Sequence, residues 1–168
     1  MSFKTTLFAG LMAATFAAPA WADIEVHDAY ARSSNPMAGA AFMVIHNHGE
    51  VDDRIVSVTS DAAARVELHT HIEDADGVMR MVHVEEGMAL PAGGEIIMKR
   101  GAEHVMFMGL TDPFEQDEIV TITFQFENAD DLVVEIPVDQ DRVDAGAHGG
   151  HGGHGDHGAG EDQSSHDH

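Results

Sequence analysis

Residues 24–138 consist of short runs of β-branched and aromatic residues that are separated by Gly, Pro, Asn and Asp. In residues 120–126 every second side chain is Val, Ile or Phe and the side chains between them are Thr or Gln, so such a strand has one apolar and one polar face. This pattern predicts an all-β domain, folded as an antiparallel Greek-key sandwich or barrel. The expected strands are residues 24–32, 40–46, 54–60, 64–71, 78–84, 94–99, 104–110, 119–127 and 132–138.

Both ends of the chain differ from this β-region. Residues 1–22 contain Lys4, then an uncharged and largely apolar stretch, and finally Ala20-Trp21-Ala22. This order is typical of a secretory signal peptide, so we expect cleavage after Ala22 and export to a bacterial-type periplasm. No later segment is long and apolar enough to cross a bilayer, so no membrane insertion is expected. Residues 139–168 have almost no bulky apolar side chains and predict a disordered, His-rich tail, which leaves residues 23–138 as the folded domain.

The composition excludes several classes of partner and of chemistry. The formal net charge of −22 repels nucleic acid and anionic lipid and attracts cations, so we expect no nucleic-acid partner. The sequence contains no Cys, which excludes thiolate nucleophiles, zinc–thiolate sites, iron–sulfur clusters and blue-copper centres. It also lacks the hydrolase motifs G-x-S-x-G and H-E-x-x-H, and we predict that the protein is not an enzyme.

Histidine and methionine recur with a spacing of two residues in three of the expected strands. Because side chains two residues apart lie on the same face of a strand, each strand offers several metal donors on one face. Any one of these methionines, taken alone, is also an ordinary core residue. Their combination with histidine on three strands favours a metal site made by the fold. The donors are His69 and His71, then Met79, Met81 and His83, and finally His104, Met106 and Met108.

The types of donor indicate which metal such a site prefers. A thioether sulfur is soft and uncharged and an imidazole is borderline and uncharged, so a mixed set favours Cu(I) over hard cations. The set also avoids thiolates, which an oxidising compartment converts to disulfides. We infer a site that captures Cu(I) and releases it to a better set of ligands, as a carrier requires.

Several short motifs, in order along the chain, resemble the periplasmic copper chaperone family called PCuAC, and the similarity covers nearly all of residues 24–138. The resemblance implies a cupredoxin-like β-fold, a Cu(I) site formed by a His, Met, His, Met set, and delivery of copper to the copper centres of cytochrome c oxidase. The motifs are Asp28-Ala29-Tyr30-Ala31-Arg32, Asp53-Arg54-Ile55, Leu68-His69, Gly77-Val78-Met79-Arg80-Met81, Leu90-Pro91-Ala92-Gly93-Gly94 and His104-Val105-Met106-Phe107-Met108-Gly109-Leu110.

Carried over residue by residue, the resemblance implies that the Cu(I) ligands are His69, Met81, His104 and Met106. His71 remains a rival for His69, because it lies two residues away on the same expected strand face. Met79 and Met108 are further candidates, either beside the ligands or as exchange ligands. The implied partners are copper acceptors such as cytochrome c oxidase subunits or other copper chaperones.

The tail carries a second set of histidines on a Gly-rich chain. Imidazole titrates near pH 6.5, so at neutral pH these side chains are free to bind Cu(II), Zn(II) or Ni(II). We predict that the tail is a second metal site, mainly for Cu(II). A periplasmic copper or zinc buffer or resistance protein, without a dedicated acceptor, is the alternative function. The tail histidines are His148, His151, His154, His157, His166 and His168.

Overall fold

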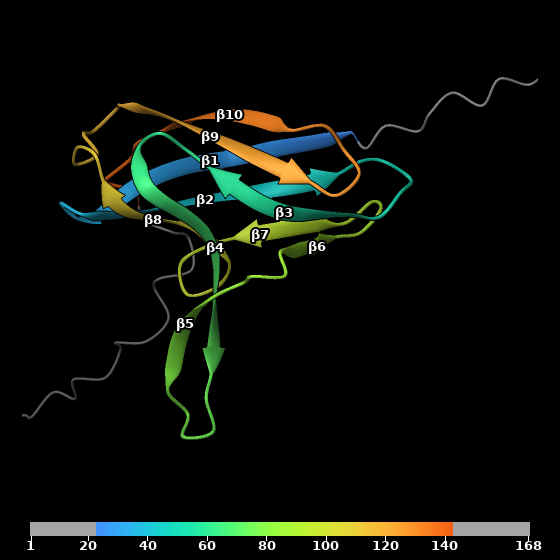
Figure 1. Cartoon of the computed structure of the whole chain (residues 1–168), viewed down its shortest axis with the longest axis horizontal. Coiled ribbons are helices and arrows are strands. Elements are labelled where there is room, and N and C mark those ends of the chain that lie inside the picture. The colour runs from blue at the N-terminus through green and yellow to red at the C-terminus, as the bar shows by residue number, and fades with distance from the viewer. Residues whose placement is uncertain (1–22, 143–168) are drawn as a thin grey trace, which may run out of the picture.

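The strands pair into two antiparallel sheets that face one another in the computed structural model, which describes residues 23–142 (Figure 1). Nine of the ten strands in this part of the chain coincide with the nine expected ones, with ends that differ by a few residues. The described residues include no helix that could span a membrane. The strands are β1 (Ile24–Asn35), β2 (Ala38–Asn47), β3 (Asp53–Thr59), β4 (Ala63–Glu73), β5 (Met79–His83), β6 (Met88–Leu90), β7 (Glu95–Met98), β8 (His104–Leu110), β9 (Ile119–Phe126) and β10 (Leu132–Pro137).

The larger sheet has the order β1-β2-β8-β4-β5, with β7 also paired to β2, and the smaller sheet has the order β10-β9-β3-β6. Each of these strand pairs is antiparallel, as the alternating pattern predicts. The sequence does not predict β6, because three residues are too few to show an alternation. β6 forms because it adds to the edge of β3, with Met88 opposite Ile55 and Leu90 opposite Asp53.

The main core lies between the two sheets and is filled by the apolar faces of their strands. Phe107 of β8, Phe124 of β9 and Ile45 of β2 are completely buried in it. The larger sheet also has a buried cluster on its opposite face, which we call the outer face. Tyr30 and Phe42 form this cluster with Ala40, and their ring centroids are 5.1 Å apart. One sheet therefore buries side chains on both faces.

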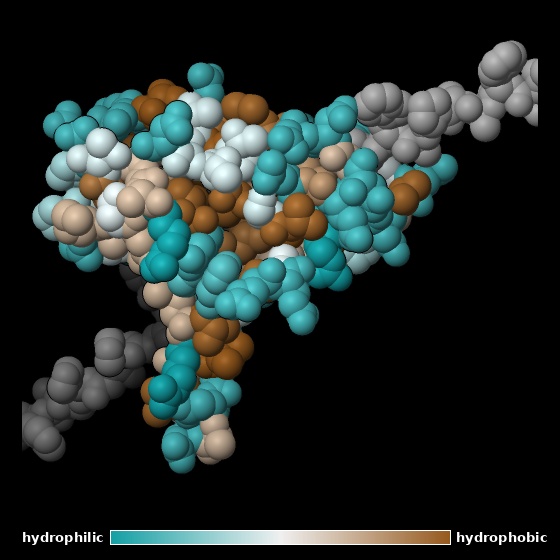
Figure 2. All heavy atoms as spheres, in the orientation of Figure 1, coloured by the Kyte–Doolittle hydropathy of each residue, from teal (hydrophilic) through white to brown (hydrophobic). Residues whose placement is uncertain are grey.

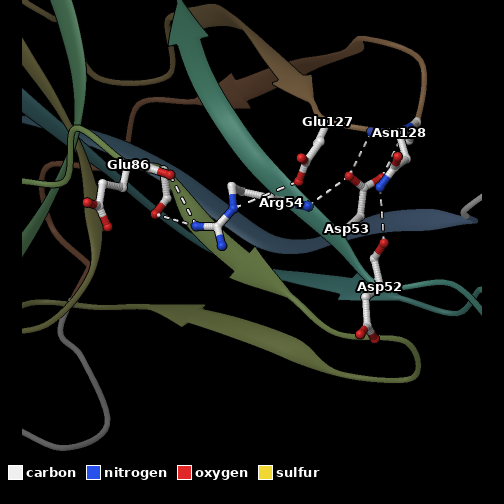
Figure 3. Close-up of polar contacts among 8 residues, drawn as sticks. Asp52, Asp53, Arg54, Glu86, Glu127 and Asn128 are labelled. Atoms are coloured by element: carbon white, nitrogen blue, oxygen red, sulfur yellow. Dashed lines mark hydrogen bonds and ion pairs between the residues drawn. The ribbon is translucent and has the colours of Figure 1, made fainter.

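A buried carboxylate and the guanidinium next to it in sequence join two turns to β3 (Figure 3). Asp53 accepts hydrogen bonds from the backbone N–H groups of Arg54, Asn128 and Ala129, at 2.7, 3.0 and 2.9 Å. The guanidinium of Arg54 donates to the carbonyl oxygen of Glu86 at 3.1 Å. The three backbone bonds satisfy a carboxylate that would be costly to bury alone, and they hold the turn after β9 against β3. The Arg54 bond holds the turn before β6 against the same strand.

Residues 139–142, which follow Val138, the predicted end of the domain, also contact the larger sheet. The Asp139 N–H donates to the carbonyl oxygen of Ala31 at 2.8 Å, and the Arg142 guanidinium lies 4.4 Å from the centroid of the Tyr30 ring. Residues 139–142 therefore pack on the outer face. The predicted signal peptide, residues 1–22, and residues 143–168 with all six tail histidines lie outside the described residues.

The end of β4 and the whole of β5 project from the sandwich as a two-stranded arm (Figure 1). Ile72, Met79 and Met81 are exposed on this arm. Figure 2 shows its apolar and polar side chains next to one another.

Candidate metal centre

Three neighbouring strands bring most of the predicted donors together on the outer face. β4 lies between β8 and β5, and the register places His69 opposite His104 on one side and opposite His83 on the other. Two residues further along β4, His71 lies opposite Met81 of β5. The three strands are distant in sequence, so only the sheet order makes this a common site.

His104 is buried, with 4% of its surface exposed, and its two ring nitrogens have different surroundings. Nδ1 lies 2.9 Å from the carbonyl oxygen of Ala102, which can only accept, so Nδ1 carries the hydrogen. Nε2 of the neutral ring then has a free lone pair, and it lies 3.2 Å from the sulfur of Met81. A thioether has no hydrogen to donate. Two electron-pair donors therefore face one another, which is the arrangement that a bound cation stabilises.

His69 is also buried, with 8% of its surface exposed, and it presents the opposite ring nitrogen. Its Nε2 donates to the Oε2 atom of Glu67 at 2.9 Å. Its Nδ1 is buried and has no hydrogen-bond partner in the structure. A buried polar atom without a partner costs about 1–3 kcal/mol. The ring centroids of His69 and His104 are 5.8 Å apart, so two rings that each have one nitrogen free of hydrogen bonds to oxygen lie side by side on the sheet.

Met106 and His71 lie beside this trio. Met106 is two residues from His104 on the same face of β8, is partly buried, and pairs with Glu67 of β4. The His71 ring centroid is 5.4 Å from that of His104, and its Nδ1 lies 3.3 Å from the Ala102 carbonyl oxygen. His71 and His104 thus approach the same carbonyl, so His71 is positioned beside the site.

Met79 and Met108 lie further along their strands. Met79 is exposed near the tip of the arm, where it pairs with Glu73. The sulfur of Met108 lies 3.3 Å from a guanidinium nitrogen of Arg65. The structure does not bring these two methionines next to the His104–Met81 contact.

Glu67 and His83 belong to the site, although the sequence analysis did not select them as ligands. The Oε2 atom of Glu67 contacts both His69 and, at 3.8 Å, the Nδ1 atom of His83. The hydrogen bond from His69 lowers the pKa of Glu67, so this carboxylate stays ionised and keeps the hydrogen on Nε2 of His69. The period-two alternation from His69 back to Glu67 is the signal that places Glu67 on this face.

The residues present fit a soft metal ion. The buried free Nδ1 of His69, the free Nε2 of His104 and the sulfur of Met81 are all uncharged donors, two of nitrogen and one of sulfur. Soft and borderline donors of this kind disfavour hard cations such as Mg²⁺ and Ca²⁺. The ionised Glu67 beside His69 offsets part of the charge that a bound cation brings.

Residues 24–138 match the model of the LpqE-like family, which is described as putative lipoprotein LpqE-like. The chain belongs to the LpqE-like family. A curated relative is the putative lipoprotein Lxx21020 of Leifsonia xyli subsp. xyli, which is 29% identical over 115 residues, or 68% of this chain and 69% of the relative.

Solved structures share the fold of this LpqE-like domain. The solution structure of Cu(I)-DR1885 from Deinococcus radiodurans has a TM-score of 0.54 and 26% identity, and the match covers 74% of this chain and 83% of that one. The copper-bound PCuAC domain from PmoF2 has a TM-score of 0.57 and 18% identity, with 72% of this chain and 96% of that domain covered. These likenesses confirm the predicted cupredoxin-like antiparallel fold and support the predicted relation to PCuAC domains. The ligand roles of individual residues stay predictions.

The environment of His104 gives the LpqE-like domain a distinctive response to pH. Burial lowers the pKa of His104 below its usual 6.5, and the bond to Ala102 opposes this only in part. As pH falls below 6.5, the unfolded chain binds a proton at this residue before the folded one does. The stability that His104 contributes is therefore complete above pH 6.5 and is lost as pH falls through the folded pKa.

We expect the His104 ring resonances of the metal-free protein to titrate below pH 6.5 in NMR spectra. The urea midpoint should fall over the same pH range, and this part of the fall should be absent in His104→Asn. Titration of His104 at or above pH 6.5 would contradict the assignment of its desolvated, neutral state.

Proposed function

We propose that this protein is an exported carrier of Cu(I) in the bacterial envelope. One observation carries the proposal: the free Nε2 of His104 faces the Met81 sulfur at 3.2 Å, and the neighbouring His69 ring has a buried, unpartnered Nδ1. A soft, uncharged N and S set is suited to Cu(I). The structurally similar PCuAC domain from PmoF2 is copper-bound and the DR1885 structure is a Cu(I) form, which supports the same metal here.

The proposed ligands are His69, Met81, His104 and Met106. Met106 completes the set because it follows His104 on the same face of β8 and pairs with Glu67, the hydrogen-bond partner of His69. His71 is the substitute nitrogen donor closest to His104.

The exposure of Met81 supports a role in transfer instead of catalysis. Its side chain is 46% exposed on the projecting arm, whereas both histidines are buried in the sheet. An acceptor can therefore reach the metal from the Met81 side while the histidines still hold it. We propose that acceptors are other copper proteins, such as cytochrome c oxidase subunits or other copper chaperones. The word lipoprotein in the name of the relative from Leifsonia supports a place in the envelope, and we propose the periplasm, after cleavage following Ala22.

We further propose that residues 143–168 form a separate Cu(II) site through their six histidines. An anaerobic Cu(I) competition titration and a Cu(II) titration, each on the mature chain and on a chain ending after Arg142, test both proposals. The truncated chain should bind one Cu(I) with unchanged affinity and lose most of its Cu(II) capacity. The end point is Arg142 because this residue and Asp139 contact the sheet. The unfolding midpoint of the metal-free protein should stay nearly unchanged.

Acidification is the control for the proposed assignment of Cu(I) to the folded domain and Cu(II) to the tail. Protons compete for imidazole below about pH 6.5, whereas a thioether does not protonate at these pH values. Cu(II) should leave the tail first, and Cu(I) should stay on the domain to lower pH. Full Cu(II) capacity in the truncated chain, or loss of both metals together, would overturn the two-site proposal. A truncated chain that binds no Cu(I) would overturn the proposed carrier site.

A further inference from the structure

A second group of metal-binding side chains lies at the other end of the outer face. The Oε2 atom of Glu25 is 3.1 Å from Nε2 of His48 and 3.3 Å from Nε2 of His27. One ligand atom from each of these three residues lies within 4.8 Å of the others. All three side chains are exposed. We call Glu25, His27 and His48 the β1–β2 cluster.

The pairing of β1 with β2 explains why these residues meet. Glu25 and His27 are two residues apart on β1, and Glu25 pairs directly with His46 of β2. The chain continues for two more residues to His48, whose N–H donates to the carbonyl oxygen of Asp23 at 2.8 Å. This bond extends the β1–β2 ladder beyond the pair Ile24–Asn47 and fixes the backbone at His48. The cluster is therefore held by strand register and not by a loose loop.

His46 supports the cluster from beside it. The ring centroids of His46 and His48 are 4.0 Å apart, with planes inclined at 39°. Nε2 of His46 lies 3.4 Å from the carbonyl oxygen of Gly93. His46 is thus engaged with the neighbouring turn, and its ring restricts the orientation of His48.

The β1–β2 cluster is separate from the candidate metal centre. Phe42 of β2 packs near His104, with ring centroids 6.1 Å apart. His46 lies four residues further along the same strand, which corresponds to about 13 Å. No residue is shared, and the donors also differ, because the cluster has a carboxylate and no sulfur.

We propose that Glu25, His27 and His48 form a second metal site, for a borderline divalent cation of the Zn(II) and Cu(II) class. Two imidazoles and one carboxylate are the donor types these ions take, and water completes the coordination at an exposed site. In this cluster the carboxylate is itself a donor and offsets part of the charge of a divalent ion, whereas the donors around His104 are all uncharged. The surrounding protein, with a net charge of −22, attracts such cations. The proposal does not depend on Cu(I) binding at His69 and His104.

The test follows the imidazole resonances of the full mature chain by NMR during a Zn(II) titration at pH 7.5, with free Zn(II) set by a chelator buffer. Buffering removes the effect of competing histidines elsewhere in the chain, and each ring reports on its own site. We expect the rings of His27 and His48 to shift together, with one shared midpoint. Glu25→Gln should raise that midpoint at least tenfold, and His27→Ala should do the same for the His48 ring.

Glu85→Gln is the matched control, because Glu85 is an exposed carboxylate in the turn after β5, the strand at the opposite end of the larger sheet from β1, and the change removes the same charge. It should leave the shared midpoint within about twofold of its original value. Different midpoints for His27 and His48, no shift of either ring, or equal effects of the two Gln variants would each overturn the proposal. The backbone NMR spectrum of each variant shows whether it is folded. We expect each variant to fold, because the side chains that are replaced are exposed.

Discussion

Replacing Met81 by Ala weakens Cu(I) binding by the mature protein roughly 100-fold or more in an anaerobic competition titration. The expected size follows from the loss of a ligand, since even residues that only support ligands cost 10–100-fold in metal affinity. The same change should scarcely affect folding, because the Met81 side chain is 46% exposed on the arm. A large loss of affinity with an unchanged urea midpoint is therefore the expected combination.

Met37→Ala is the matched control. Met37 is 62% exposed in the turn between β1 and β2, so the substitution removes the same side chain from a position outside the site. It should leave the Cu(I) affinity unchanged. Equal effects of the two substitutions would show that Met81 is not a ligand, and the proposed site would then need a different sulfur donor.

Replacing Gly87 by Ala should produce the largest loss of stability among single glycine substitutions in the described chain. Gly87 has a φ of +73°, and an added Cβ would lie 2.1 Å from the backbone carbonyl oxygen of Ile55. Ile55 is completely buried in the core, so β3 cannot move away without disturbing its packing. We expect a loss of roughly 3 kcal/mol or more, measured by urea unfolding of the metal-free protein.

Gly93→Ala separates the two causes of this loss. Gly93 has a similar φ of +65°, but nothing lies within 4 Å of its added Cβ. The backbone conformation alone should cost about 1–2 kcal/mol. A similar loss for both variants would mean that the turn at Gly87 moves away from β3 at little cost, despite the hydrogen bond from Arg54 to Glu86.

Much of the fold can be predicted from the sequence because its strands alternate clearly. Residues 119–126 and 132–137 show the period-two pattern, and both form strands of the smaller sheet. β6 could not be predicted, since its three residues form a strand only through pairing with β3. The sheet order, which places β8 beside β4, also follows from packing between segments distant in sequence.

The candidate sites show the same division between local and long-range information. Spacing alone places His69 and His71, or His104 and Met106, on common strand faces. It does not show that His104 approaches Met81, or that Glu67 bonds to His69, because these contacts depend on sheet order and rotamers.

The β1–β2 cluster is hidden from the sequence for the same reason. His27 and His48 are distant along the chain and match no motif, so the sequence gives no reason to join them. A bulge between His27 and Tyr30, where Asp28 has a φ of 57°, also breaks the alternation of β1. Because of this extra residue, His27 and Tyr30 share the outer face although they are an odd number of residues apart.

The position of the His69–His104 pair on the outer face has a consequence for the speed of metal exchange. The main core between the sheets lies behind these strands, and its fully buried residues, Phe107 and Ile45 among them, contribute nothing to the donor set. An ion held at the outer face can enter and leave while that core stays closed. Its off-rate is then governed by replacement of ligands and by motions of the exposed arm, which are local openings of low free energy. Global unfolding, with half-lives that reach days in small domains, does not limit it.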